Sequence, residues 1–289
     1  MRLCRFNDNR IGLVRGANVH DVTAILDELP VLRYPPPPGD PLIANLEMLR
    51  PKMEKLADRA KPVPSSAVRF LSPVANPSKI IGTPVNYQKH REEADKDAEI
   101  AVYSSATRAR TIEEQGLFIK ASSCLVGPSQ GVAVRFPDRR TDHEAELGLV
   151  IGKRARNVSE DKALHYVAGY AIALDMVVRG TEDRSFRKSI DSYGVLGPWL
   201  VTADELGDPS NLDFSLTVNG ELRQASNTRL MVMNIPKQIS WASRWYDLLP
   251  GDIIMTGTCE GVGRVVPGDV MAIEFERIGR MDVPVRAAD

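Results

Sequence analysis

The chain has 289 residues, of which 43% are hydrophobic and 26% charged, a composition typical of a globular protein with one large domain or a large and a small one. The formal net charge of -1 gives no electrostatic reason to expect a nucleic-acid partner or an anionic membrane surface. The N-terminus lacks the apolar stretch of a signal peptide, and no run of about 18 apolar residues occurs. The three cysteines, Cys4, Cys124 and Cys259, show no C-x-x-C spacing, so we expect reduced thiols in a cytoplasmic protein.

The first 72 residues have the pattern of a small N-terminal α/β domain. RLCRF and IGLVRG are strand candidates on either side of the turn-prone residues 7–9, which predicts a hairpin. VHDVTAILDEL and residues 42–60 have the apolar spacing of helices. The proline-rich segment 34–39 separates them as a stiff connector, and we expect a domain boundary near residue 72.

Residues 73–289 are rich in strand candidates and poor in long helices. The candidates are SKIIG, GVAVRF, AELGLVIG, YAIALDMVV, FSLTVNG, DIIMTG and MAIEFERI, separated by glycine, proline and aspartate turns. ISWASRWYDLL is the exception and predicts a helix that ends before Pro250. The pattern argues against a βαβ repeat and predicts an α+β, mostly β fold, a mixed β-sandwich or roll. Residues 91–116 are polar and weakly periodic, as in a surface insertion or a lid.

Several common active sites are excluded because their motifs are absent or incomplete in this sequence. The chain has no G-x-S-x-G nucleophile elbow and no Walker A sequence. His143-Glu144 begins like H-E-x-x-H, but Leu147 stands where the second histidine is needed. The glycines around 257–263 resemble a dinucleotide-binding loop, yet Val266 occupies the last glycine position and a strand follows.

Acidic residues in two predicted strands indicate a metal site. Residues two apart in a strand share a face, so Glu144 and Glu146 lie side by side, opposite the apolar face of AELGLVIG. Asp175 lies in a second apolar run, where an unpaired acid is costly to bury. One divalent cation would compensate all three acids, and oxygen ligands favour Mg²⁺, with Mn²⁺ or Ca²⁺ as alternatives. Pairing of these acids with Arg or Lys across the sheet is the other interpretation.

A run of motifs resembles the fumarylacetoacetate hydrolase family over roughly residues 78–280. The central one is DHEAELGLVIGKRARNVSEDKALHYVAGYAIALDMVVRG, with its E-x-E strand, I-G-K-x-A-x-x-V turn, V-A-G-Y and aspartate. The others occur in the expected order: KIIGTPVNYQKH, FIKASSCLVGP, KSIDSYGVLGPWLVTADE, VNGELRQASNT and LLPGDIIMTGTCEGVG.

The resemblance implies roles for individual residues. Glu144, Glu146 and Asp175 match the metal ligands of the family. His90 and Glu93 match an H-x-x-E dyad in which the glutamate orients a histidine that activates water. Lys188 matches a lysine that contacts a substrate oxygen, and Thr258 matches a loop position that lines the site. Arg179 keeps the arginine of the A-R-D-x-Q pattern, but here the chain reads VVRGTED, the connection to Lys188 is short, and Cys259 replaces the usual proline.

The implied reaction is hydrolysis of a carbon–carbon bond in a 2,4-dioxo acid, with a metal as Lewis acid, water activated by His90, and an enolate stabilised by Lys188. The same platform also serves decarboxylases, isomerases and hydratases or dehydratases that act on 2-oxo acids. A non-catalytic metal-binding scaffold is the alternative from another class. The resemblance also implies a homodimer, with a small-molecule acid as the only other partner.

Overall fold

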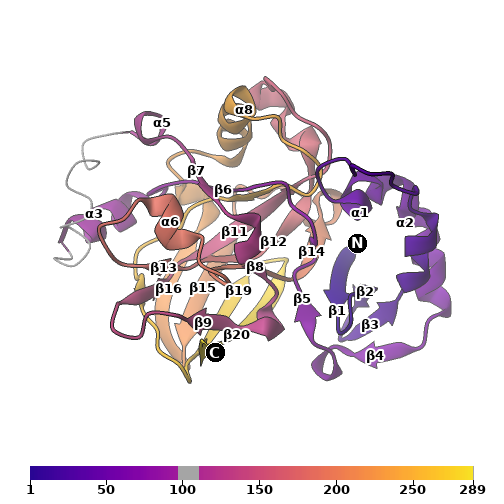
Figure 1. Ribbon diagram of the computed structural model, residues 1–289, viewed down its shortest axis with the longest axis horizontal. Coiled ribbons are helices and arrows are strands. Elements are labelled where there is room, and N and C mark those ends of the chain that lie inside the picture. Colours follow the sequence, from indigo (N-terminus) through magenta and orange to yellow (C-terminus); the bar gives the residue numbers. More distant parts are fainter. Residues whose placement is uncertain (97–110, 289) are drawn as a thin grey trace.

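The computed structural model describes residues 1–96 and 111–288, and strands dominate this part of the chain (Figure 1). The predicted α+β, mostly β class is confirmed, since the described strands form one large sheet and two smaller ones. Residues 97–110, the centre of the segment considered as a lid, lie outside the described residues. In the same described part, no helix is long and apolar enough to cross a membrane.

The large sheet runs through the whole molecule in the order β4-β3-β2-β1-β14-β12-β11-β17-β6-β7, with β5 on β1 and β8 on β14. Its N-terminal strands are β1 (Arg2–Phe6), β2 (Arg10–Arg15), β3 (Asn18–Asp21), β4 (Pro62–Pro64) and β5 (Phe70–Leu71). The others are β6 (Ile80–Gly82), β7 (Phe118–Lys120), β8 (Leu125–Val126), β11 (Ala145–Ile151), β12 (Val167–Asp175), β14 (Gly194–Thr202) and β17 (Ile253–Met255). The pairing of β1 with β14 therefore joins the N-terminal strands to the rest.

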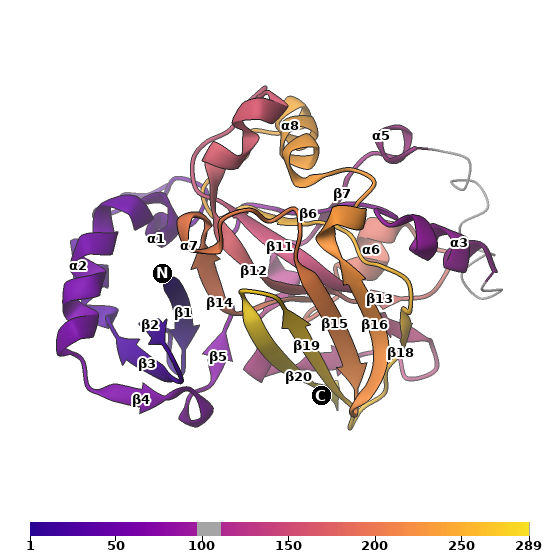
Figure 2. The same cartoon turned by 180° about the vertical axis from the view of Figure 1, so that it is seen from behind.

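The two smaller sheets lie beside the central strands, as the reverse view shows (Figure 2). One has the order β16-β15-β19-β20-β9, with bounds Glu221–Asn227, Asp213–Val218, Val270–Phe275, Gly279–Ala287 and Val132–Val134. The other has the order β13-β10-β18, with bounds Val177–Val178, Thr141–His143 and Gly263–Arg264. All the strand candidates of residues 73–289 contain a strand, while β7, β8, β10, β14, β16, β18 and β20 were not predicted.

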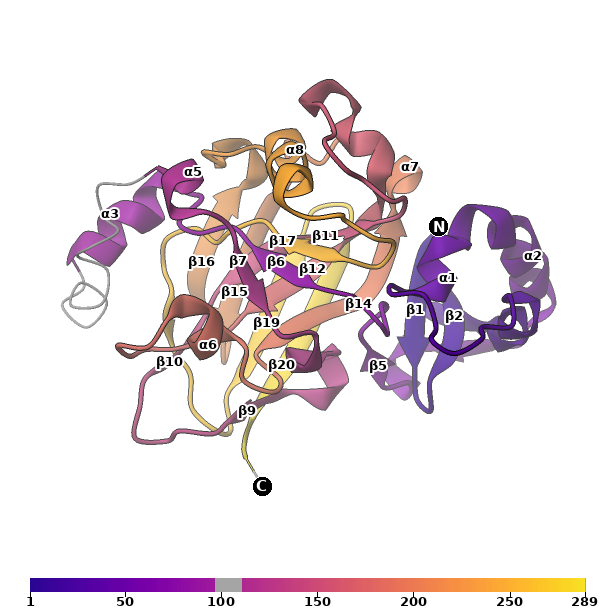
Figure 3. The same ribbon diagram turned by 45° about the horizontal axis from the view of Figure 1, so that its top comes forward.

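The helices are short and lie around the sheets (Figure 3). The α-helices of the described residues are α1 (Pro41–Ala44), α2 (Leu46–Arg59), α3 (Gln88–Lys96), α5 (Ile112–Gln115), α6 (Arg184–Lys188), α7 (Ala203–Leu206) and α8 (Ile235–Trp245). The 3₁₀ helices there are η1 (Thr23–Glu28), η2 (Ser65–Ala67), η3 (Ser122–Cys124), η4 (Pro128–Gln130), η5 (Glu160–Tyr166) and η6 (Thr228–Leu230). The helical segment predicted over 42–60 is confirmed as α1 and α2, and the helix predicted over 239–249 is confirmed in part, since α8 begins at Ile235 and ends at Trp245.

One predicted helix is wrong. VHDVTAILDEL forms the end of β3 and the 3₁₀ helix η1 instead of an α-helix. The carboxylate of Asp21 accepts hydrogen bonds from the backbone N–H of Thr23 at 2.8 Å and from its hydroxyl at 2.5 Å. Such local side-chain bonds compete with the helical pattern of backbone hydrogen bonds, so the chain turns here after pairing β3 with β2.

The two faces of β11 and β12 join different cores. Odd-numbered residues of β11, as predicted, are buried in the core that includes Phe214 and Ile273 of the five-stranded sheet. The even-numbered residues of β11 lie on the opposite face, where Val150 packs in a second core that includes Leu49 and Met53 of α2. Glu146 belongs to this even face, so the acids lie at the edge of a packed apolar layer and not in the solvent.

Candidate metal centre and active site

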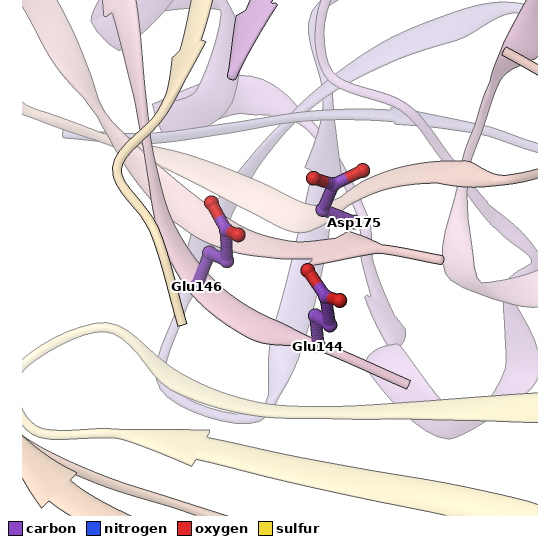
Figure 4. Close-up of side chains that lie close together, drawn as sticks. All are labelled: Glu144, Glu146 and Asp175. Carbon is purple, nitrogen blue, oxygen red and sulfur yellow. The ribbon is translucent and has the colours of Figure 1, made fainter. Parts of the chain in front are cut away.

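Three carboxylates converge at the end of the β11–β12 ladder. Glu144 directly precedes β11 and Asp175 ends β12, and the backbone N–H of Asp175 donates to the Glu144 carbonyl at 2.9 Å. Because the strands are antiparallel and in register, the side chains of Glu144, Glu146 and Asp175 point to the same side of the sheet (Figure 4). One ligand atom from each lies within 4.8 Å of the others, and all three side chains are buried.

Lysine and arginine side chains compensate two of these acids. The Lys188 ammonium donates to Glu144 Oε2 and to Asp175 Oδ2, both at 2.6 Å. Lys120, which is fully buried, donates to Asp175 Oδ1 and to the Tyr193 carbonyl. Both cations come from outside the β11–β12 pair, Lys188 from the end of α6 and Lys120 from the end of β7. Pairing with lysine, the second interpretation of the acids, therefore exists at Glu144 and Asp175.

Glu146 is different, because its hydrogen bond within the described residues comes from the Gly257 backbone N–H, at 2.7 Å. Burial raises the pKa of Glu146 well above its usual range, and the charges of Asp175 and Glu144 raise it further. Burial also raises the pKa of Glu144, but the charges of Lys188 and Arg179 outweigh it and lower the pKa below its usual range.

This arrangement fits a divalent cation. A buried carboxylate without a charged partner is unfavourable, and a cation between the three acids would remove that cost. Glu144, Glu146 and Asp175 offer oxygen ligands only, the donor set that Mg²⁺ and Mn²⁺ prefer. These three residues are the ones that would hold the ion.

The histidine–glutamate pair lies on α3, and His90 lines the same pocket as the acids. His90 Nδ1 is 3.4 Å from Glu93 Oε2, one helical turn apart as the i, i+3 spacing predicts. Both oxygens of Glu93 also accept from the Gly261 N–H at 3.0 Å, which ties α3 to the 256–261 loop. Burial alone raises the pKa of Glu93, but the hydrogen bonds from His90 and Gly261 outweigh it and lower the pKa.

Gln224 of β16 orders the same loop, a role that the sequence did not indicate. Its side-chain oxygen accepts from the Ala145 N–H at 3.0 Å and lies 3.1 Å from His143 Nδ1. Its nitrogen donates to Thr258 Oγ1 at 2.8 Å and to the Cys259 carbonyl at 3.0 Å. Gly257 has a φ of +98°, and a Cβ there would lie 2.4 Å from Asn86 Cβ, so the loop requires glycine at this position.

One cavity of about 100 Å³ brings the predicted residues together. His90, Arg179, Lys188, Thr258 and the three acids line it, while Glu93 lies behind His90. Arg179 donates to Asp142 Oδ2 at 2.8 Å and is 3.5 Å from Glu144 Oε1. The lining also includes Arg184 and Arg187 of α6 and Phe118 of β7, which were not predicted. Lys120 and Gln224 stand within the motifs FIKASSCLVGP and VNGELRQASNT, which is the signal that could have identified them.

Comparisons with known proteins agree with this site. The model of the fumarylacetoacetate (FAA) hydrolase C-terminal family matches residues 79–286. A maleylpyruvate hydrolase from Aquipseudomonas alcaligenes is 51% identical over 287 residues, 99% of this chain and 100% of that protein. An oxaloacetate tautomerase from Rattus norvegicus is 36% identical over 78% of this chain and 71% of its own length. A crystal structure of maleylpyruvate hydrolase from Sphingobium sp. SYK-6 with manganese(II) and pyruvate is 39% identical and covers 100% of both chains, with a TM-score of 0.83.

Proposed function

The chain belongs to the fumarylacetoacetate hydrolase family, and from that premise we propose that it is a divalent-metal-dependent hydrolase of a carbon–carbon bond in an acylpyruvate, a 2,4-dioxo acid of the maleylpyruvate type. One observation carries this proposal: a single cavity is lined both by the three carboxylates and by His90, whose Nδ1 is 3.4 Å from Glu93. Mg²⁺ is our proposed ion. Mn²⁺ is the alternative, since the Sphingobium enzyme was crystallised with it.

The protein residues divide the chemistry between them. When bound, the divalent cation supplies a Lewis acid that polarises the 2-oxo acid. His90, oriented by Glu93, accepts a proton from water, and the hydroxide adds to the carbonyl carbon at position 4. The bond between carbons 3 and 4 then breaks, so that one product is a carboxylic acid and the other is the enolate of pyruvate. Lys188 stabilises the enolate charge until carbon 3 is protonated.

The first 72 residues line no part of the pocket, whose residues begin at Thr83. We therefore propose that residues 73–289 form the catalytic domain and that residues 1–72 are a small separate domain without a chemical role. We also propose a homodimer. Two large apolar side chains support it by their exposure, Phe186 of α6 at 70% and Trp245 of α8 at 68%, because association would remove such surface from water. Sedimentation equilibrium would test the dimer.

The proposed activity is tested by following the enol absorbance of acylpyruvates with the purified protein, with Mg²⁺, with Mn²⁺ and after chelation. We expect metal-dependent loss of the enol signal with release of pyruvate, and a fall of about 10²- to 10⁴-fold in the rate of His90→Ala. Asp175→Asn should abolish metal binding in calorimetry as well as turnover. Oxaloacetate is assayed beside the acylpyruvates, because one relative is an oxaloacetate tautomerase. Turnover of oxaloacetate alone, or acylpyruvate hydrolysis that survives chelation, would refute the proposal.

A further inference from the structure

The cavity is lined by more cationic side chains than carboxylates. Three acids line it, against four cations: Arg179, Arg184, Arg187 and Lys188. Arg179 and Lys188 are paired with carboxylates. Within the described parts of the chain, no carboxylate is hydrogen-bonded to Arg184 or Arg187. Arg187 donates instead to the backbone carbonyls of Glu182 and Val178, at 2.8 and 3.1 Å.

Arg184 has the greater capacity to bind a ligand. Its Nη2 donates to the Gln115 side-chain oxygen at 3.2 Å, and its guanidinium lies over the Phe118 ring, 5.6 Å from the centroid. A guanidinium has five N–H donors in a planar fork, so most of its donors are not used by the described residues. Burial lowers the pKa of Arg184, and the charges of Glu144 and Asp175 offset this only in part, since neither carboxylate is hydrogen-bonded to the Arg184 guanidinium in the described residues.

The Phe118 ring fixes where this arginine lies. Gly82 faces Phe118 across β6 and β7, and a Cβ at Gly82 would lie 2.1 Å from Phe118 Cζ, so glycine leaves the space that the ring occupies. Lys188 lies over the same ring, 5.4 Å from its centroid. The ring therefore supports Lys188, beside the acids, and Arg184, one helical turn away on α6.

A second hollow continues from this point. A groove of about 510 Å³ shares Phe118, Arg184 and Arg187 with the metal pocket. A substrate whose 2-oxo acid end lies at the carboxylate triad can therefore place its other end beside Arg184, at the junction of the two cavities. Glu182 and Asp183 also line the groove, but neither carboxylate is hydrogen-bonded to Arg184 or Arg187 in the described residues. An apolar tail would leave the free donors of Arg184 without an acceptor, whereas a carboxylate would supply one.

We propose that Arg184 forms a second anion-binding subsite, supported by the charge of Arg187, and that this subsite selects dianionic acylpyruvates, which carry a carboxylate on the acyl group. This inference rests on the proposed function for its substrate. The recognition itself is the binding of a carboxylate by a guanidinium fork, which adds a charge-assisted hydrogen bond to the binding of the 2-oxo acid.

A pair of non-reacting ligands tests the subsite. 2-Oxopimelate and 2-oxoheptanoate have the same chain length, and they differ in the carboxylate at the far end. Calorimetry with the Mn²⁺-loaded protein should give a preference of about 10- to 100-fold for 2-oxopimelate, the range expected for a hydrogen bond to a charged group. Arg184→Met should remove most of that preference, and Arg184→Lys should keep part of it. Arg10→Met is the matched control, because Arg10 lies over the Phe6 ring but outside the pocket.

The outcomes separate the two proposals. Equal affinities for the two ligands in the parent protein, or no binding of either, would overturn the subsite. A preference that survives in Arg184→Met would overturn the role of Arg184, and equal losses for both ligands would indicate a structural role. If the preference behaves as expected but no acylpyruvate is hydrolysed, the subsite stands and the proposed hydrolase activity fails.

Discussion

Replacing Lys188 with methionine tests most directly how the charges of the buried carboxylates are compensated. Lys188 is 5% exposed, and its ammonium donates to Glu144 and Asp175, both at 2.6 Å. Methionine keeps much of the length of the side chain but removes the charge, so two buried carboxylates lose a shared partner. The metal-free protein should be destabilised strongly, because a buried charge without its partner keeps its desolvation cost.

The expected loss of unfolding free energy depends on the ion pairs that remain in Lys188→Met. Breaking a buried ion pair costs about 3 to 5 kcal/mol, and we expect about 3, since Lys120 still pairs with Asp175. A bound divalent cation replaces the missing charge, so the metal-bound protein should lose less stability than the metal-free one. If the cation restores half of the loss, linkage requires Mn²⁺ to bind about tenfold more tightly to Lys188→Met than to the parent. Loss of a site residue is thus expected to strengthen metal binding while turnover falls.

Urea unfolding in chelator and in saturating Mn²⁺ measures both free energies, and calorimetry measures the Mn²⁺ affinity. Lys237→Met is the control, because Lys237 forms a surface ion pair with Glu113 at 2.5 Å and should contribute no more than about 1 kcal/mol. Weaker or unchanged Mn²⁺ binding by Lys188→Met would refute the reasoning, as would a loss of less than about 1 kcal/mol in the metal-free protein.

Three further substitutions test the surroundings of the site and the close packing of Gly127 on β5. Gln224→Leu removes all the hydrogen bonds of a side chain that is 1% exposed and should lower the free energy of unfolding by about 3 to 5 kcal/mol. An unchanged urea midpoint would contradict this. The lowered pKa of Glu93 means that its contribution to stability is present above its unfolded pKa of about 4.3 and is lost as pH falls through the folded value. Glu93→Gln should therefore flatten the acid side of the stability profile, measured by urea unfolding between about pH 3 and 6; a profile that keeps its slope would exclude this carboxylate as the cause. Gly127→Ala places a Cβ 2.2 Å from the backbone of β5 and should cost about 2 kcal/mol or more in thermal unfolding, so a parent-like transition would show that the contact relaxes.

The sequence predicted the convergence of the three acids because strand alternation is a local rule. Residues two apart in a strand lie on the same face, which groups Glu144 with Glu146. An acid within an apolar run, such as Asp175, needs a compensating charge when it is buried. The three acids could therefore be grouped before the fold was known. The spacing also predicted that His90 and Glu93 meet on a helix. What the sequence could not supply was the compensation itself. Lys120 and Gln224 reach the site from strands whose pairing is decided by the whole sheet.

The central strand β14 escaped prediction for a physical reason. GVLGPWLVT contains Pro198, and proline lacks the N–H that an interior strand donates to its neighbours. In the structure, the register of β12 and β14 shifts between the pairs Tyr170–Val201 and Ile172–Gly197, so Pro198 falls in an irregularity where no ladder bond is needed. A proline is tolerated in this central strand because it lies at the irregularity. The sequence alone does not show where such an irregularity occurs, so β14 could not be predicted from it.

The segment between Asp175 and Lys188 is where we expect substrate specificity to be determined. Its ends match the family pattern and hold the acid and the lysine that touch each other at 2.6 Å, while the residues between them depart from that pattern. Arg184 comes directly after the departing segment VVRGTED, and α6 places it against the Phe118 ring, where it lines both cavities. Because the ends of a short connection are held by the metal centre, changes within it alter the wall that faces the substrate and leave the reaction centre in place. Exchanging residues 176–187 between relatives should therefore change which acyl group is preferred before it changes the dependence on metal.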